Sequence, residues 1–320
     1  MEKKPPLLIL TGPTAVGKTA LSIALAREVQ GEIISADSMQ VYKQMDIGTA
    51  KIKKEQMQGV THYMIDEWNP DEEFNVMIFQ KCVKEIMEDI YNRGKIPILV
   101  GGTGFYIQAV LNDIAFTKEK QGDEIRADLQ NLAKEKGASY LHHELQKVDK
   151  ESAEAIHPNN IKRVIRALEY FQSTGQKFSD HNKEERQKGS PYNFLYLVLT
   201  MNRKVLYERI DKRVDQMMEE GLVKEVKQLL DAGYSRNLVS MQGLGYKEIA
   251  SALFKECTME EAVYRLKRDT RHFAKRQMTW FRRERDVTMI NKDNFSNNHE
   301  IVNYIMKLAV EKGICSCREG

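Results

Sequence analysis

Short apolar runs alternate with longer amphipathic stretches along the N-terminal part of the chain. The short runs at residues 7–10, 32–35 and 96–100 have the length of strands, and the unbroken apolar character of 7–10 is typical of a strand buried on both faces. The stretches at 20–29 and 74–93 instead repeat apolar residues at helical spacing. Strands that alternate with helices in this way indicate a parallel sheet. The pattern therefore predicts an α/β fold with a parallel sheet flanked by helices.

The pattern changes between residues 117 and 190, where charged residues increase and the apolar spacing becomes helical throughout. A strand pattern returns at residues 192–200 and predicts a further strand of the first sheet. We therefore expect a discontinuous core domain of residues 1–116 and 191–320, with an inserted all-helical domain of residues 117–190. Within the insertion, residues 177–190 are rich in Lys, Glu, Asn and Gln and are expected to form a mobile loop.

Helical patterns follow at residues 203–220 and 223–232, and a longer one runs from about residue 259 to residue 284. The longer pattern interleaves aromatic with basic residues, which fits an RNA backbone held beside stacked bases. An amphipathic helix that buries its aromatic residues explains the same pattern, so both readings stay open. The aromatic and basic residues are Phe273, Trp280, Phe281, Arg265, Lys267, Arg268, Arg271, Lys275, Arg276, Arg282 and Arg283.

A phosphate-binding motif, G-x-x-x-x-G-K-T, lies between the first predicted strand and the first predicted helix and indicates a P-loop-type parallel sheet flanked by helices. Its backbone N–H groups and the helix dipole are suited to a polyphosphate. Lys18 is expected to reach the outer phosphates, and the Thr19 hydroxyl to hold Mg²⁺. The predicted phosphate-binding residues are Gly12, Pro13, Thr14, Ala15, Val16, Gly17, Lys18 and Thr19.

Three polar residues follow predicted strands and are therefore expected at the edge of the sheet that lines the ligand crevice. Asp37 follows the second strand, and a cap or turn role is the alternative to a functional one. Asp66, at the end of a possible strand at 62–66, is a rival candidate for a metal-holding carboxylate. Thr103 lies in the turn Gly101–Gly104, where the absence of side chains permits a close approach of phosphate or base, although a tight turn alone explains the glycines.

The composition indicates a soluble, globular protein, with 42% hydrophobic and 30% charged residues among 320. The sequence has no apolar stretch that could span a bilayer, and its N-terminus lacks the apolar region of a signal peptide. A cytoplasmic protein without membrane partners is expected. Reduced thiols are expected at Cys82, Cys257, Cys315 and Cys317, and residues 315–317 are expected to form a loose tail.

The sequence resembles one family closely, the tRNA dimethylallyltransferases, also called tRNA isopentenyltransferases. The resemblance covers nearly the whole chain and does not include the zinc finger of the long eukaryotic members, which implies the bacterial form. The segments that carry it are Gly12 to Thr19, Ser35 to Tyr42 (SADSMQVY), Gly101 to Gly104, Lys162 to Glu169 (KRVIRALE), Gly243 to Glu248 (GLGYKE) and Thr270 to Arg282 (TRHFAKRQMTWFR).

The resemblance implies transfer of a dimethylallyl group from dimethylallyl diphosphate to N6 of the adenine on the 3′ side of the anticodon. It implies Asp37 as the general base, Thr103 as a contact of the transferring group, and Arg126 as a further diphosphate contact. Lys18 and Thr19, with Mg²⁺ as cofactor, would stabilise the departing diphosphate. The implied protein is a monomer, and its partner is the anticodon stem-loop of tRNA.

The resemblance also implies a tRNA-binding surface to which the helical insertion contributes. Gln40 is the candidate for hydrogen-bonding the target adenine, and basic residues would hold the RNA backbone. The implied tRNA-binding residues are Asp37, Ser38, Met39, Gln40, Thr103, Arg126, Lys162, Arg163, Val164, Ile165, Arg166, Gly243, Gly245, Tyr246, Lys275 and Arg276.

Two other functions share some of these features. A small-molecule kinase would use the same phosphate loop and an aspartate near the second strand, but it has no use for the basic aromatic stretch near Trp280. A non-catalytic RNA-binding protein could use the loop as a nucleotide switch, and it would need a region that senses the γ-phosphate.

Overall fold

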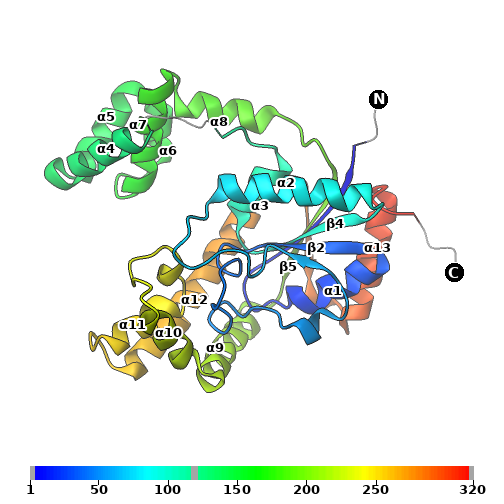
Figure 1. Cartoon of the computed structure of the whole chain (residues 1–320). Coiled ribbons are helices and arrows are strands. Elements are labelled where there is room, and N and C mark those ends of the chain that lie inside the picture. The colour runs from blue at the N-terminus through cyan, green and yellow to red at the C-terminus, as the bar shows by residue number, and fades with distance from the viewer. Residues whose placement is uncertain (1–3, 117–121, 317–320) are drawn as a thin grey trace. The chain divides into compact units, whose positions relative to one another are not determined.

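The computed structural model describes residues 4–116 and 122–316, which form two compact units (Figure 1). Residues 1–111 and 191–320 belong to the first unit, and residues 112–190 to the second. The expected domain boundary at residue 117 lies outside the described residues, as does Cys317. None of the described helices is long and apolar enough to cross a membrane.

A six-stranded sheet forms the centre of the first unit, with the strand order β3-β2-β4-β1-β5-β6 and parallel pairing throughout. This confirms the predicted α/β class with a parallel sheet. The predicted strand at 62–66 is real but consists of two residues only. The strands are β1 (Pro6–Thr11), β2 (Gly31–Ala36), β3 (His62–Tyr63), β4 (Ile96–Gly101), β5 (Asn193–Thr200) and β6 (Val287–Asn291).

Apolar residues along β1 alternate between two hydrophobic cores, one on each face of the sheet. Leu7 and Ile9 belong to one core, and Leu8 and Leu10 to the other. All four are at most 1% exposed, which explains the unbroken apolar run in the sequence. The sheet is therefore covered on both faces, as the sequence predicts.

Helices cover both faces of the sheet, and Figure 1 shows α1 and α13 together on one side of it. Helices α2, α3, α10 and α11 contribute to the other core, and α9 and α12 contribute residues to both. The helices of this unit are α1 (Lys18–Glu28), α2 (Val76–Asn92), α3 (Gly104–Leu111), α9 (Arg203–Glu220), α10 (Leu222–Asp231), α11 (Tyr246–Leu253), α12 (Met259–Phe281) and α13 (Asn298–Glu311), with short 3₁₀ turns η1 (Lys54–Met57), η2 (Ser240–Gln242) and η3 (Lys292–Asn294).

The last strand and helix, β6 and α13, were not predicted from the sequence. Strand β6 is an edge strand in which Ile290 is the buried residue, so its sequence lacks a continuous apolar run. Helix α13 does carry a readable signal, because Ile301, Ile305 and Ala309 recur every four residues and are buried against α1 and the sheet.

The second unit is all-helical and has its own apolar core, built mainly from α4, α5 and α7. The expected mobile loop at 177–190 is wrong, because Phe178–Gln187 forms helix α8. The Ser179 N–H donates to the buried carboxylate of Asp149 at 2.8 Å, and His181 stacks on the ring of Tyr170. These contacts fix the first turn of a helix whose polar composition suggests a loop. The remaining helices are α4 (Gly122–Lys136), α5 (Ala138–Val148), α6 (Lys150–Ala155) and α7 (Ile161–Thr174).

Candidate active site

The phosphate loop joins β1 to α1 through two glycines that other residues cannot replace without strain. Gly12 has φ +142°, and a Cβ there would lie 2.6 Å from the carbonyl oxygen of Leu199. Gly17, directly before α1, has φ +95° in the left-handed region. The loop therefore presents its backbone at the carboxyl edge of the sheet, as the motif requires.

A buried glutamine of α12 connects the phosphate loop to the glycine turn after β4. Gln277 is 6% exposed. Its Oε1 accepts a hydrogen bond from the N–H of Thr14 at 2.9 Å, and its Nε2 donates to the carbonyl of Gly102 at 3.0 Å. No role was predicted for Gln277 from the sequence. In the sequence, Gln277 shares a helix face with Ala274 and Phe281, and both of these residues are fully buried. An amide on such an apolar face indicates a buried hydrogen-bonding side chain.

Lys18, the lysine of the motif, extends back across the loop. Its Nζ donates to the carbonyl oxygens of Gly12 at 3.0 Å and Pro13 at 2.9 Å. Burial lowers the pKa of Lys18 to about 8; the negative charge of Asp37 opposes this shift and the positive charge of Arg213 adds to it. Thr19, the predicted magnesium ligand, is exposed in the first turn of α1.

Asp37 has the turn role that the sequence left open, and it also lines a cavity. Its Oδ1 accepts hydrogen bonds from the backbone N–H groups of Met39 at 2.9 Å and Gln40 at 3.3 Å, which is a turn role. The same residue lines a cavity with Thr14 of the phosphate loop. The Thr103 hydroxyl accepts from the Ser38 N–H at 3.2 Å, so the glycine turn is attached to this segment as well.

The cavity has a volume of about 320 Å³ and combines an apolar wall with charged groups. Asp37 is its only carboxylate among the described residues. Such a mixed lining suits a ligand with one hydrocarbon end and one anionic end. The apolar wall includes Ile210, Val214, Met217, Leu244, Leu266 and Phe273, and the polar lining includes Thr14, Asp37, Ser38, Thr49, Thr103, Arg213, Lys247 and Arg276.

Arg213, on α9, is a cavity residue that the sequence analysis missed. Burial lowers its pKa, with the charge of Asp37 opposing the shift and that of Arg209 adding to it. Among the described residues, Arg213 and Arg209 form no ion pair. The available signal was a pair of arginines four residues apart, hence on one face, in the predicted helix at 203–220.

The Gly243–Glu248 turn forms another wall of the cavity, and much of it is occupied by internal contacts. Tyr246 is fully buried, and its hydroxyl donates to Glu225 Oε1 at 2.7 Å. Glu225 also accepts from the N–H groups of Asp46, Ile47 and Gly48 at 2.8–3.0 Å. Gly243 and Tyr246 line the cavity. The Tyr246 hydroxyl is thus bound inside the protein.

Two other predicted residues near this site make internal contacts instead of lining the cavity. The Gln40 amide donates to the carbonyl of Thr49 at 3.2 Å and accepts from the Ser35 hydroxyl at 3.2 Å. Asp66 pairs with Lys51 at 2.5 Å, which leaves Asp37 as the carboxylate of this cavity.

The predicted residues of the insertion make contacts within that unit. Arg126 and Arg166 both pair with the buried Glu169, at 2.8 and 3.1 Å. Lys162 and Arg163 are exposed, whereas the side chains of Val164 and Ile165 are 0% and 5% exposed in the helical core.

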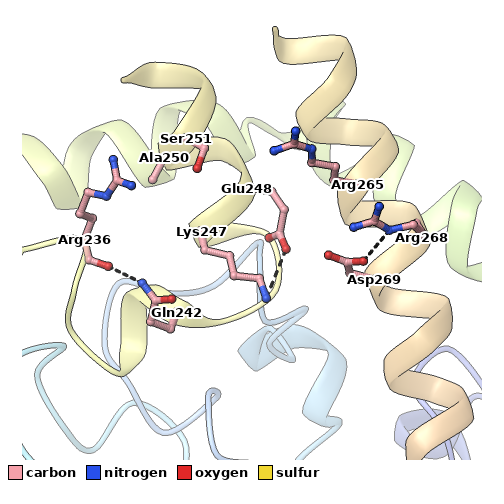
Figure 2. Close-up of a pocket in the computed structure, with 9 residues that line it drawn as sticks. All are labelled: Arg236, Gln242, Lys247, Glu248, Ala250, Ser251, Arg265, Arg268 and Asp269. Carbon is pink, nitrogen blue, oxygen red and sulfur yellow. Dashed lines mark hydrogen bonds and ion pairs between the residues drawn. The ribbon is translucent and has the colours of Figure 1, made fainter. Parts of the chain in front are cut away.

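Besides the cavity, several hollows lie along α12 in the first unit. A groove of about 410 Å³ follows the helix, and its lining includes Lys275, Arg276 and Trp280. A pocket of about 470 Å³ lies behind the Gly243–Glu248 turn (Figure 2). Four cations line this pocket, and each of them has a carboxylate partner, so we call it the paired pocket. The pairs are Arg236 with Glu256 at 2.6 Å, Lys247 with Glu248 at 3.6 Å, Arg265 with Glu261 at 2.5 Å and Arg268 with Asp269 at 2.8 Å.

The parallel sheet and the phosphate loop define an α/β protein of the P-loop type, and residues of the loop line the same cavity as Asp37. The profile of the family described as "IPP transferase" matches residues 40–284. The chain belongs to this family, which confirms the family predicted from the sequence.

Relatives and solved structures agree with this membership. The tRNA dimethylallyltransferase of Lachnoclostridium phytofermentans is 60% identical, over 97% of this chain and 99% of the relative. That of Bacillus licheniformis is 52% identical, over 89% of this chain and 90% of the relative. The structure of the full-length tRNA isopentenylpyrophosphate transferase of Bacillus halodurans has a TM-score of 0.72 at 45% identity and covers 97% of this chain and 98% of that chain. The structure of a eukaryotic dimethylallyltransferase that acts on tRNA has a TM-score of 0.79 at 28% identity, and the match covers 97% of this chain and 84% of that one.

Proposed function

We propose that this protein transfers a dimethylallyl group from dimethylallyl diphosphate to N6 of the adenine on the 3′ side of the anticodon in tRNA. The observation that carries the proposal is the cavity in which one carboxylate, Asp37, lies among the phosphate loop, Arg213 and an apolar wall. The names of the relatives support the same reaction. A hydrocarbon chain with an anionic leaving group fits this lining.

The barrier to this reaction lies in breaking the bond between the prenyl carbon and the diphosphate oxygen. Negative charge develops on the diphosphate as that bond breaks, and fixed donors lower the cost of this charge. The backbone of the loop Gly12–Thr19 and the cations of Lys18 and Arg213 are positioned for this role. The loop then stabilises a leaving group and hydrolyses no nucleotide.

Mg²⁺ fits the residues at the loop but would depend on the substrate for most of its ligands. No group of three or more His, Cys, Asp or Glu side chains that could hold a metal exists among the described residues. Thr19 is exposed beside the loop, and Mg²⁺ in such sites takes few protein ligands, keeps several waters and binds substrate phosphates. When bound, Mg²⁺ would neutralise charge on the departing diphosphate.

Asp37 is the residue that we assign as the general base. The N6 lone pair attacks the prenyl carbon, the carbon–oxygen bond breaks with its electrons leaving on the diphosphate, and a proton passes from N6 to the carboxylate. Two backbone N–H groups hold Oδ1, so the orientation of the carboxylate is fixed before the substrate binds. A base in such a position contributes about 10²- to 10⁴-fold to the rate.

The adenine must leave the stack of the anticodon loop to reach a carbon inside a cavity, as other base-modifying enzymes require. The groove with Lys275, Arg276 and Trp280 offers cations and an aromatic ring for the RNA. Exposed Lys162 and Arg163 would hold further phosphates from the insertion. The proposal includes Arg126 as a contact of diphosphate and tRNA, Arg166 as a contact of tRNA, and Gln40 as the contact of the adenine. It also includes a monomeric protein located in the cytoplasm.

The deciding experiment incubates the purified protein with Mg²⁺, radiolabelled dimethylallyl diphosphate and unmodified tRNA with adjacent adenines in its anticodon loop. A parallel reaction replaces the prenyl donor with labelled ATP and a panel of small acceptors. We expect label in the RNA and no consumption of ATP. Unlabelled RNA with consumption of ATP would contradict the proposal and support the kinase alternative.

A further inference from the structure

A second pair of cations lies against the end of the phosphate loop that adjoins α1. Lys292 follows β6, at the same carboxyl edge of the sheet as the loop. Its Nζ lies 3.0 Å from the point where a Cβ on Gly17 would stand, and Nη2 of Arg209 lies 3.6 Å from that point. Both cations therefore reach the last glycine of the loop, where the absence of a side chain admits them.

These two cations are close to one another, and in the described part of the chain neither has a carboxylate partner. Among the described residues, neither Lys292 nor Arg209 forms an ion pair. Burial lowers the pKa of Lys292, and the positive charge of Arg209 lowers it further. Asp293, the adjacent acid in the sequence, accepts instead from the Asn202 N–H at 2.6 Å.

Lys292 and Arg209 add to two cations already described, Lys18 at the phosphate loop and the cavity residue Arg213. The positive charge of Arg209 lowers the pKa of Arg213, and the positive charge of Arg213 lowers the pKa of Lys18. We call Lys18, Arg209, Arg213 and Lys292 the loop cations. The carboxylate of Asp37 raises the pKa of both Lys18 and Arg213, and that of Glu220 raises the pKa of Arg213 as well. Cations held together with so little compensation repel one another, and a bound polyanion relieves that repulsion.

We propose that Lys292 and Arg209 form a second half of the diphosphate site, on the α1 side of the phosphate loop. Lys18 touches the first residues of the loop, at Gly12 and Pro13, whereas Lys292 and Arg209 adjoin Gly17. Cations at both ends of one loop match a ligand with two linked phosphoryl groups. The inference rests on the proposed function, because it takes the diphosphate of the prenyl donor, and the diphosphate released from it, as the ligand.

The test measures binding of inorganic diphosphate with Mg²⁺ by calorimetry, without tRNA or prenyl group. The variants are Lys292→Ala, Lys292→Gln, Arg209→Ala and the Lys292→Ala/Arg209→Ala double variant. Lys212→Ala and Lys307→Ala are matched controls, since each removes one exposed cation, from α9 and α13 respectively. Thermal unfolding verifies that each variant is folded, and Lys292→Gln provides a second variant of similar size.

We expect each single variant to weaken diphosphate binding about tenfold, the double variant to weaken it more, and the controls to stay within about twofold. The KM for the prenyl donor should rise in parallel while the affinity for tRNA stays unchanged. Unchanged diphosphate binding in the folded double variant would overturn the inference. Weaker tRNA binding with unchanged diphosphate binding would also overturn it and would identify an RNA phosphate as the ligand.

The same data separate this inference from the proposed function. If the wild type binds diphosphate through Lys292 and Arg209 but transfers no prenyl group to tRNA, the anion site stands and the proposed function fails. If transfer occurs and the variants bind diphosphate as the wild type does, the proposed function stands and the second half-site fails.

Discussion

Two basic regions of the same unit differ in how their charges are compensated. Among the loop cations, Arg213 lines the cavity of Asp37, and Lys18, Arg209 and Lys292 lie at the phosphate loop. None of the four forms an ion pair among the described residues. In the paired pocket of Figure 2, each of the four cations has a carboxylate partner within 3.6 Å. Number and type of cation are similar in the two regions. The two regions therefore differ in whether each cation has a carboxylate partner. Cations without one favour a bound anion, whereas paired cations are already neutralised.

The two regions differ because their charges come from different distances along the chain. Arg265 pairs with Glu261 one turn earlier on α12, and Arg268 pairs with the next residue, Asp269. Such local pairs form wherever the helix forms. Lys292 and Arg209 come from separate elements that the sheet brings to one loop, and neither forms an ion pair among the described residues. The unpaired cations therefore come together only when the chain folds.

The largest effect in this comparison is expected for Arg213→Ala. The variant removes the cavity cation that we propose as a contact of the departing diphosphate, and loss of one preorganised donor costs about 10²- to 10³-fold in kcat. Single-turnover transfer of labelled dimethylallyl group at saturating donor and tRNA measures this directly. A rate within a few-fold of wild type would show that Arg213 does not act on the leaving group.

A smaller effect is expected from pH, because the pKa of Lys18 is lowered to about 8 by burial. Below that pH the ammonium is charged and favours the diphosphate, and above it the free enzyme loses this charge. Affinity for inorganic diphosphate should therefore fall about fivefold between pH 8 and pH 9 in calorimetric titrations. An affinity that stays constant or rises over this range would contradict the assignment of Lys18.

The smallest effect is expected for Arg268→Ala in the paired pocket. Its charge is already compensated by Asp269, and exposed ion pairs contribute little. Diphosphate affinity and the rate of transfer should stay within about twofold of wild type. A loss as large as that of Arg213→Ala would mean that compensation does not separate the two regions.

The sequence predicted those parts of the fold and site that depend on local signals. The phosphate loop has its pattern within eight residues, Gly12–Thr19, and β1 has its continuous apolar run, so both were predicted correctly. Asp37 was predicted at the sheet edge because it directly follows a strand, and it does line the cavity there. Its role as a base stays a prediction.

The parts that were missed depend on contacts between distant segments. Gln277 acts on a loop 263 positions away, and nothing near it in the sequence indicates that contact. Lys292 follows an edge strand that the pattern did not reveal. Helix α8 was predicted as a loop because its polar composition concealed the tertiary contacts of Ser179 and His181.

The most direct test of the central claim is a comparison of wild type with Asp37→Asn in single-turnover transfer, with the binding of tRNA and of diphosphate measured on the same preparations. The substitution keeps an oxygen that can accept from the Met39 N–H but removes the base. We predict that both ligands bind as they do to wild type while the transfer step slows about 10²- to 10⁴-fold. A transfer step within a few-fold of wild type, with both ligands bound, would contradict the assignment of the cavity's one carboxylate as the base.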